Sequence, residues 1–329
     1  MSDSPFNSKA YYQAWINHFE PNSQLIKIDY LDGIHFFKNS KWPFYHNVGK
    51  NFTNKQNYSF NSTSISPSNK VALIYDVQDF ELQDDHDFNN FKVKRIKQYP
   101  GYFCDLTKFE TIDDLKKYCF KSSKSRYNFD RSTRVLETKF NISYKVYFGA
   151  ISDEDYFREM KALKKLLAKR FDAKGTFNTV LPIWDFYLDL VLPLIKEKKA
   201  NLNVIYNDNE PIAMSINFIA GSQVIIAIRT FDIDYNRNNI GNIEIYKLLE
   251  WAMDFNMQIV DFSKGNTDYK KRWSTNEYHF ENHIIYQKGK LTPAFIGNVL
   301  SMFFKTKQYL RDKNVNTLYT KMKYKIKGA

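Results

Sequence analysis

The sequence predicts an α+β protein of two similar domains, each a mixed and mostly antiparallel sheet flanked by helices. Helical and strand patterns follow one another in a related order in both halves of the chain. The length of 329 residues suggests about two domains. A composition of 43% hydrophobic and 26% charged residues is typical of a globular protein. We expect a first domain over 1–140, a second over 141–290 and a basic helical tail over 291–329.

The first half combines one helix, a hairpin, further strands and a second helix. Thr111-Ile112-Asp113-Asp114 resembles a capping box with aspartate in place of glutamate, so a helix begins there and runs toward Phe120. Asp32-Gly33 is a turn signal typical of a hairpin. The other expected elements are a helix over 6–20 and strands over 25–30, 33–37, 71–77, 93–96 and 102–106.

The second half repeats this plan with stronger patterns. Turn signals at Asp208-Asn209 and Gly221 separate three strands, which predicts an antiparallel meander. Pro193 stands near the end of a helical pattern, where it marks a kink or the last turn. The expected elements are helices over 121–140, 153–171 and 184–196, and strands over 142–148, 203–206, 212–219, 223–230 and 278–286.

The stretch from Ile243 to Trp273 organises the second half. Apolar residues at three- and four-residue steps predict an amphipathic helix over 242–256, which Gly241-Asn242 precede. A short buried strand over 258–262 follows. Free N–H groups at a helix start favour a bound anion, so this order of elements is typical of a phosphate site. Gly241 as a plain turn residue is an equally good interpretation.

The net charge and the cysteine count limit the possible partners and compartments but do not choose among the partners. The net charge of +12 favours nucleic acid, anionic lipid, phosphorylated cofactors or acidic proteins. Two cysteines, Cys104 and Cys119, do not make a disulfide framework and indicate a reducing compartment. The sequence has neither a signal-peptide pattern nor an apolar run of membrane-spanning length. We therefore expect a cytoplasmic protein.

Several motifs resemble those of a known superfamily. The pattern Asp261-Phe262-x-x-Gly265-x-x-x-Tyr269-Lys270-x-x-Trp273 is similar to a motif of the GNAT-superfamily acyltransferases of the cellulose-biosynthesis CelD type. Those proteins are similar in turn to the Fem-type peptidyltransferases, which carry an aromatic–lysine pair at this place. Other similar segments are Ser123 to Asn128, Arg134 to Glu137, Asp208 to Ala213, and Phe231-Asp232 followed by Asn239-Ile240-Gly241. The resemblance covers about residues 120–290 and matches the first 120 residues only weakly.

The resemblance implies tandem GNAT-like domains, of which the first is degenerate, and an N-acyltransferase activity. An amine would attack a thioester carbonyl, and the enzyme would stabilise the oxyanion that develops. Lys270 is the candidate for that charge, Asp261 for a base or for orienting the amine, and Tyr269 for an acid. For Tyr269 and Trp273, packing in the core is the stronger interpretation, and the alternative role for Lys270 is to hold its loop. The donor-binding residues that we expect are Gly241, Asn242, Ile243, Arg237 and Gly265.

The donor and the acceptor stay open. The stretch from Arg237 to Asn242 has one glycine and a spacing one residue longer than the common GNAT pyrophosphate loop. Acyl-CoA, the phosphopantetheine of an acidic acyl-carrier protein, and aminoacyl-tRNA under a Fem-type alternative all suit a basic surface. The acceptor is a primary amine, such as an amino sugar or amino acid of surface-polysaccharide or envelope biosynthesis. The rival class is a GNAT-fold protein that binds a ligand without catalysis.

Two further features of the sequence are its C-terminal tail and a pair of histidines. The tail over 291–329 has an apolar stripe and many lysines, so it either docks on the first domain, which we favour, or makes a peripheral membrane contact. His279 and His283 have a spacing that could hold zinc, but they stand in a strand pattern where residues four apart lie far from each other. We therefore expect no metal site.

Overall fold

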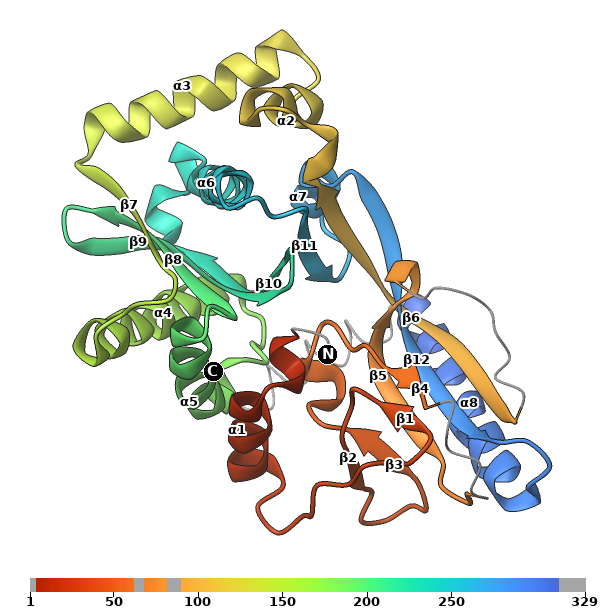
Figure 1. The fold of residues 1–329 in the computed structure, drawn as a ribbon. Coiled ribbons are helices and arrows are strands. Elements are labelled where there is room, and N and C mark those ends of the chain that lie inside the picture. Colours follow the sequence, from red (N-terminus) through yellow and green to blue (C-terminus); the bar gives the residue numbers. More distant parts are fainter. Residues whose placement is uncertain (1–3, 62–67, 82–89, 314–329) are drawn as a thin grey trace. The chain divides into compact units, whose positions relative to one another are not determined.

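The computed structural model describes residues 4–61, 68–81 and 90–313 and divides the chain into two compact units (Figure 1). Unit 1 contains the chain up to Gly101 and resumes at Tyr278, whereas unit 2 is Tyr102–Glu277. Both divisions fall inside long strands. The expected boundary at 140/141 therefore differs from the place where the structure divides, because residues 102–140 pack within unit 2.

Unit 1 is a mixed sheet with helices at its two chain ends. Its strand order is β2-β3-β5-β12-β6, in which β2 and β3 are antiparallel, β3 and β5 parallel, and β5 and β12 antiparallel. The helices are α1 (Lys9–Phe19) and α8 (Leu291–Asp312), with short 3-10 turns η1 (Pro5–Asn7), η2 (Lys50–Phe52) and η3 (Asp79–Glu81). The strands are β1 (Leu31–Asp32), β2 (Phe36–Lys38), β3 (Tyr45–Asn47), β4 (Ser59–Phe60), β5 (Ala72–Gln78), β6 (Phe91–Asp105) and β12 (Asn276–Gln287).

Unit 1 differs from the expectation in two places. The Asp32-Gly33 signal does not join a hairpin, since β1 pairs with β4 and β2 with β3, and only a single bridge links Ile26 to Phe36. The strands expected over 93–96 and 102–106 are one continuous strand, β6. Gly101 lies against the Tyr278 ring, where a Cβ atom would come within 2.2 Å, so this glycine serves close packing inside β6 and does not end the strand.

Helix α8 packs one face on the core of unit 1. Its buried residues are Pro293, Gly297, Ser301 and Phe304, which recur at three- and four-residue steps. A Cβ atom on Gly297 would come within 2.4 Å of the Tyr286 ring, which shows how closely helix and sheet approach. The rest of the predicted helical tail, residues 314–329, lies outside the described residues.

Unit 2 carries the second set of predicted elements. Its helices are α2 (Ile112–Cys119), α3 (Ser123–Lys139), α4 (Asp153–Lys174), α5 (Trp184–Lys196), α6 (Ile240–Asp254) and α7 (Asp268–Trp273), with 3-10 turns η4 (Leu106–Lys108), η5 (Leu181–Ile183) and η6 (Ile233–Asn238). Its other strands are β7 (Ile142–Tyr147), β8 (Ala200–Asn207), β9 (Glu210–Ala220), β10 (Gln223–Phe231) and β11 (Ile259–Lys264). The side chain of Thr111 caps α2 by accepting from the Asp114 N–H, which confirms the predicted helix start.

The sheet of unit 2 has the order β6-β11-β10-β9-β8-β7. Strands β8 to β10 form the predicted antiparallel meander, β7 pairs antiparallel to β8, and β11 pairs parallel to β10. This confirms the mixed, mostly antiparallel α+β sheet and the predicted pairing of 259–262 with the meander. Helix α6 covers one face of the sheet, and α4 and α5 cover the other (Figure 1). Because both faces are covered, the central strands are almost continuously buried.

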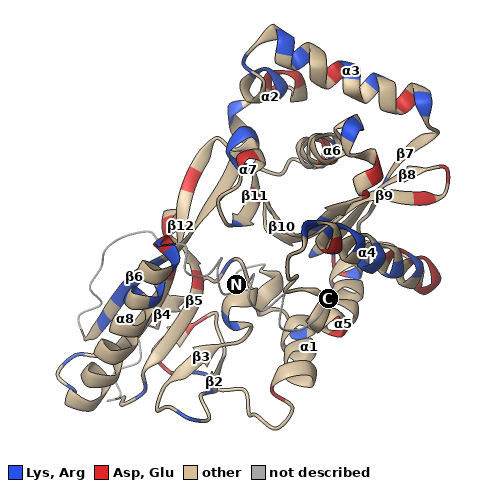
Figure 2. Ribbon diagram, turned by 180° about the vertical axis from the view of Figure 1, so that it is seen from behind, with Lys and Arg blue, Asp and Glu red and all other residues tan. Residues whose placement is uncertain are grey.

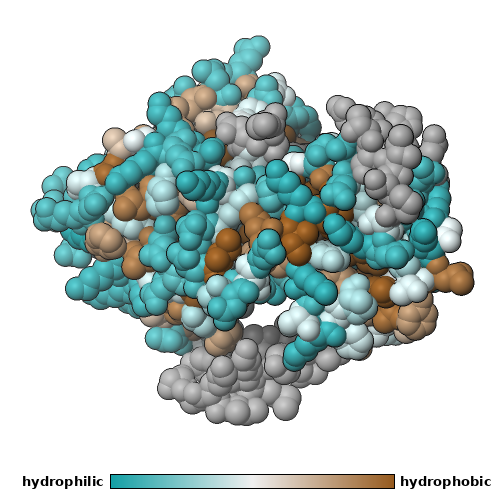
Figure 3. All heavy atoms as spheres, turned by 60° about the horizontal axis from the view of Figure 1, so that its bottom comes forward, coloured by the Kyte–Doolittle hydropathy of each residue, from teal (hydrophilic) through white to brown (hydrophobic). Residues whose placement is uncertain are grey.

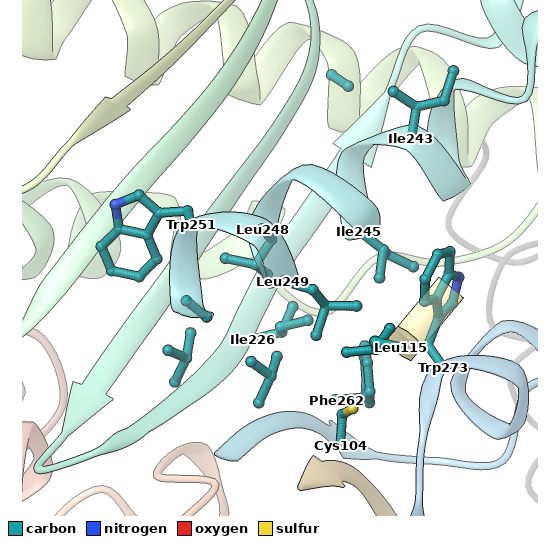
Figure 4. Packing of buried hydrophobic residues seen from close by; sticks show 14 of the residues in the cluster. Cys104, Leu115, Ile226, Ile243, Ile245, Leu248, Leu249, Trp251, Phe262 and Trp273 are labelled. Carbon is teal, nitrogen blue, oxygen red and sulfur yellow. The ribbon is translucent and has the colours of Figure 1, made fainter. Parts of the chain in front are cut away.

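The core of unit 2 lies between α6 and the sheet. Ile245, Leu248 and Leu249 of α6 point toward Ile226 of β10 and Phe262 of β11 (Figure 4). Helices α2 and α3 close the same core through Leu115, Phe129 and Leu136. The stretch before residue 141 therefore completes the second hydrophobic core, which explains why unit 2 begins at Tyr102.

None of the helices in the described part of the chain is long and apolar enough to cross a membrane. Within the same described residues, no group of three histidine, cysteine or acidic side chains is placed to hold a metal ion. His283 is buried in unit 1, where its Nε2 lies 3.0 Å from a Glu281 oxygen and its Nδ1 2.7 Å from the Tyr58 hydroxyl. Its ring thus contributes to a polar network inside the sheet.

Candidate active site

The start of α6 is the first part of the candidate site. The helix begins at Ile240, after Asn239 in a left-handed conformation. The N–H groups of Asn242 and Ile243 donate to the Asn239 carbonyl at 2.9 and 3.2 Å, so the chain itself already satisfies them. A phosphate contact at this helix start therefore falls to the N–H groups before them, including that of Gly241. Donor binding at Asn242 and Ile243 stays a prediction that these amides do not favour.

Gly241 is required by packing at this point. A Cβ atom on Gly241 would come within 2.8 Å of the Phe231 ring, which is tighter than side chains tolerate. Phe231 ends β10, so the missing side chain lets the helix start lie against the strand end. The glycine thus has a structural reason that is independent of any ligand.

A buried ion pair joins β10 to the first turn of α6. Arg229 Nη2 lies 2.6 Å from a Glu244 oxygen and also donates to the Gly241 carbonyl at 2.6 Å. The two side chains are only 9% and 2% exposed. Burial alone would lower the pKa of Arg229, but the Glu244 carboxylate outweighs it and holds that pKa above its ordinary value. The pair fixes a cation beside the helix start.

Two more cations gather around Arg229. Arg170, near the end of α4, donates to the Arg229 carbonyl at 3.3 Å and stacks on the Phe231 ring at 4.2 Å. Burial is the main cause that lowers the pKa of Arg170, and the positive charge of Arg229 lowers it further. The pKa of Lys174 is also lowered, mainly by burial and then by the charges of Arg170 and Arg229. Figure 2 shows basic residues in blue on α4. Among the described residues, Arg170 Nε is buried without a hydrogen-bond partner. The cluster has a surplus of positive charge.

Strands β10 and β11 separate beside this cluster. Their parallel register comprises Gln223↔Ile259, Val224↔Val260 and Ile225↔Asp261, although both strands continue beyond these residues. At the point of separation the Ser263 hydroxyl donates to the Ile226 carbonyl at 2.6 Å. Ser263 has a positive φ of 59°, a conformation uncommon for a residue other than glycine. The chain therefore turns away from β10 in a specified, slightly strained geometry.

Asp261 holds this turn. Its side chain is fully buried, and one oxygen accepts from the Ser263 N–H at 2.7 Å. The other oxygen lies 3.4 Å from the Gln223 amide nitrogen. An orienting role agrees with these contacts better than the action of a free base, and both roles remain predictions.

Lys270 lies at the end of the loop that follows, on α7. It is 6% exposed, and its Nζ donates to the Ser263 carbonyl at 3.0 Å and to the Lys264 carbonyl. Burial lowers the pKa of Lys270 to about 8, the Asp261 charge opposes this shift, and the Arg229 charge adds to it. Among the described residues, two of the three N–H groups of the ammonium have a carbonyl acceptor, which leaves the third for a ligand.

The other predicted residues take different places. Tyr269 is half-buried, with its ring 4.8 Å from the Arg229 guanidinium, so it belongs to the cation cluster. Trp273 is fully buried in the core of unit 2 and donates to the Asn242 side chain at 2.9 Å, in agreement with the packing interpretation. Gly265 has a φ of 103° and lies near Lys270 Nζ. Arg237 is exposed on η6.

Sequence reasoning missed Arg229, Glu244 and Arg170. Arg229 is the single charge in the apolar strand run Val224 to Phe231, a pattern that predicts a paired and buried cation. Glu244 stands on the buried face of the α6 pattern and gives a similar signal. Arg170 lies among other basic residues of α4, so the sequence does not distinguish it from a solvated charge.

Comparison with known proteins agrees with this geometry. Residues 123–271 match the family model described as an acetyltransferase (GNAT) domain. This matched segment lies inside unit 2 and is similar to a GNAT acetyltransferase domain. The match runs from α3 to α7 and thus ends just after Lys270, within the 120–290 range that the motifs suggested. No curated protein sequence matches the chain.

The chain also has a fold similar to that of solved structures, and this similarity extends beyond the matched segment. The chain is similar to FemX with a TM-score of 0.58 and 11% identity, over 84% of this chain and 91% of that one. The similarity to L-PGS from Bacillus licheniformis has a TM-score of 0.50 and 11% identity, and it covers 93% of this chain and 99% of that one. The similarity to a conserved protein of unknown function from Bacteroides thetaiotaomicron has a TM-score of 0.51 and 10% identity, and it covers 87% of this chain and 93% of that one. At such identities the similarity concerns the fold alone, and it covers both units.

Proposed function

We propose that unit 2 transfers an acyl group from a pantetheine thioester to a primary amine. The observation that carries the proposal is Lys270, a buried ammonium held by two backbone carbonyls where β11 leaves β10. Its position is fixed, it is partly dehydrated, and it has one N–H group to offer. A developing oxyanion needs this kind of preorganised positive donor.

The reaction requires one bond to form and one to break. The neutral amine nitrogen attacks the thioester carbon, and the carbonyl oxygen becomes an oxyanion that Lys270 stabilises. The tetrahedral intermediate then expels the thiolate, which takes a proton, while the new amide nitrogen loses one. Tyr269 is our candidate for the acid that serves the leaving thiolate, and Asp261 orients the Ser263 turn.

The donor would lie where the parallel pair separates. Pantetheine contains two amides, which suit the strand backbone that β10 no longer shares with β11 beyond Ile225. Its phosphate would lie near the α6 start, where Gly241 and the cations Arg229 and Arg170 supply N–H groups and charge. Acyl-CoA and an acyl-carrier protein share this chemistry. The unusual loop from Arg237 to Asn242 and the net charge of +12 favour the acidic carrier protein.

The acceptor in this proposal is an amino sugar or an amino acid of surface-polysaccharide or envelope biosynthesis. The motif around Asp261, Tyr269 and Lys270, which resembles CelD-type acyltransferases, supports this choice. A Fem-type reaction with aminoacyl-tRNA is the alternative donor chemistry, and the fold similarity to FemX is compatible with it.

Mass spectrometry of transfer products tests the proposal. The full chain is incubated with acetyl-CoA, an acyl-carrier-protein thioester or aminoacyl-tRNA, each against a panel of amino sugars and amino acids. We expect an acylated amine and an equal amount of free pantetheine thiol with one of the first two donors. Product from aminoacyl-tRNA alone would overturn the thioester assignment. Tight donor binding without any amide product would support the non-catalytic class.

A further inference from the structure

The outer face of α8 is unusually apolar for a surface helix. Leu291, Phe295 and Met302 are 90%, 69% and 67% exposed and recur at four- and seven-residue steps opposite the buried face, and the adjacent Phe303 is 57% exposed. Trp42, in the loop before β3, is 64% exposed. Exposed hydrophobic residues stand out in brown from a mostly hydrophilic surface (Figure 3). An exposed apolar stripe of this kind marks an interaction site.

A pocket beside the stripe is also apolar. It has a volume of about 470 Å³, and only hydrophobic and aromatic residues and one proline line it. Trp42 and Phe44 contribute one wall, and Phe295, Val299 and Phe303 of α8 contribute the other. All of these residues belong to unit 1. A hydrocarbon chain would contact an almost entirely apolar surface here, so few polar groups would have to lose water when it binds.

Positive charge surrounds this apolar face. Helix α8 has no charged residue before Lys305, and its last turns carry Lys305, Lys307 and Arg311 against the single acid Asp312. Strand β6 adds Lys92 and Lys94, and burial, Lys305 and Lys92 lower the pKa of Lys94, which shows that these cations lie close enough to repel one another. Lys41 precedes Trp42. An anionic partner would relieve this repulsion, whereas a second copy of the chain would bring like charges together.

We propose that the apolar face of α8 and Trp42 docks unit 1 on an anionic lipid surface. Phe295, Met302, Phe303 and Trp42 would enter the interfacial region of the bilayer, and Lys94, Lys305 and Lys307 would face the lipid headgroups. A helix lying in the interface with aromatic residues on one side and lysines at its edge has the composition that such binding requires. The proposal does not depend on acyl transfer by unit 2.

Vesicle co-sedimentation of the full chain tests the proposal, with vesicles of phosphatidylcholine alone or with 30% phosphatidylglycerol. We expect binding to the anionic vesicles only. Phe295→Ser/Phe303→Ser should lower the partition coefficient at least about tenfold, and Lys305→Glu/Lys307→Glu by about fivefold per lysine. The matched controls, Phe157→Ser and Lys161→Glu/Lys165→Glu on α4, change exposed residues of unit 2 and should bind normally.

Tryptophan fluorescence gives a second readout that does not depend on sedimentation. Of the five tryptophans, Trp15, Trp184, Trp251 and Trp273 are buried, so contact quenching by brominated anionic lipid should report Trp42. We expect a blue shift and quenching that Trp42→Phe abolishes while vesicle binding persists. Absence of anionic-vesicle binding, or unchanged binding of Phe295→Ser/Phe303→Ser, would overturn the proposal. A stable dimer in solution that this double variant dissociates would also overturn it and assign the face to a second copy.

Discussion

Lys270 is buried, and burial makes its charged form less favourable than in water. Burial lowers its pKa from the ordinary 10.5 to about 8 in the folded protein, whereas the unfolded chain keeps the ordinary value. Below pH 8 both states are protonated, and above pH 10.5 neither is. Between these values the unfolded state binds a proton that the folded state has lost. The free energy of unfolding therefore rises with pH across this window.

This linkage gives a direct prediction. Between pH 8 and 10.5 the free energy of unfolding of the wild type should rise by about 3 kcal/mol relative to that of Lys270→Met. Urea denaturation of both proteins at several pH values measures the difference, in which the other titrating groups cancel. The turnover rate, corrected for the same variant, should fall over this window because the ammonium is lost. A constant difference in stability would show that Lys270 titrates at its ordinary value.

Between elements, the Arg229–Glu244 pair joins β10 to α6. Glu244→Gln should lower the free energy of unfolding by about 3–5 kcal/mol, because it leaves a buried guanidinium without its counter-charge. Arg229→Met/Glu244→Gln should cost much less than the sum of the two single changes. Chemical denaturation of the wild type, the two single variants and the double variant measures this double-mutant cycle. Lys247→Met/Glu250→Gln, a more exposed pair on the same helix, is the control and should cost about 1 kcal/mol or less. Additive losses at Arg229 and Glu244 would contradict the coupling.

Gly241 gives a second prediction at the scale of elements. Gly241→Ala places a methyl group within 2.8 Å of the Phe231 ring, so it should lower the free energy of unfolding by about 1–3 kcal/mol. Phe231→Leu in the same chain removes the ring edge and should recover at least half of that loss. Thermal unfolding measures both variants. Failure of the second substitution to recover stability would place the cost in the helix-start backbone instead. The double variant is also the better protein in which to measure donor affinity, because its packing is relieved.

For the whole molecule, the sequence predicted unit 2 more completely than unit 1. The meander, α4 to α6 and β11 follow strong periodic patterns that local propensity and burial both favour. In unit 1 the strands are short, and their partners come from distant parts of the chain, such as β12 with β5. A turn signal such as Asp32-Gly33 cannot reveal such non-local pairing. The motif around Lys270 identified one side of the site, whereas the role of Arg229 depends on contacts with α6 that the sequence does not show.

The net charge of +12 makes a prediction about donor choice. If an acidic carrier protein delivers the acyl group, its apparent KM should rise about tenfold between 50 and 300 mM salt, because screening weakens electrostatic attraction. An uncharged N-acetylcysteamine thioester of the same acyl group serves as the control and should change less than about twofold. Steady-state kinetics at a constant amine concentration measure both. Equal salt responses would argue against a charged carrier as donor.

Single-turnover acyl transfer by Lys270→Met tests the central claim most directly. Enzyme in excess reacts with a labelled thioester and the amine that gives product with the wild type, and donor affinity is measured separately. Ser263→Gly serves as the control, because it removes the hydroxyl contact to Ile226 in the same turn while it keeps the lysine. We predict that Lys270→Met slows transfer about a hundred- to a thousandfold at nearly normal donor affinity, while Ser263→Gly stays within about fivefold. Transfer by folded Lys270→Met within about threefold of the wild type would contradict the account.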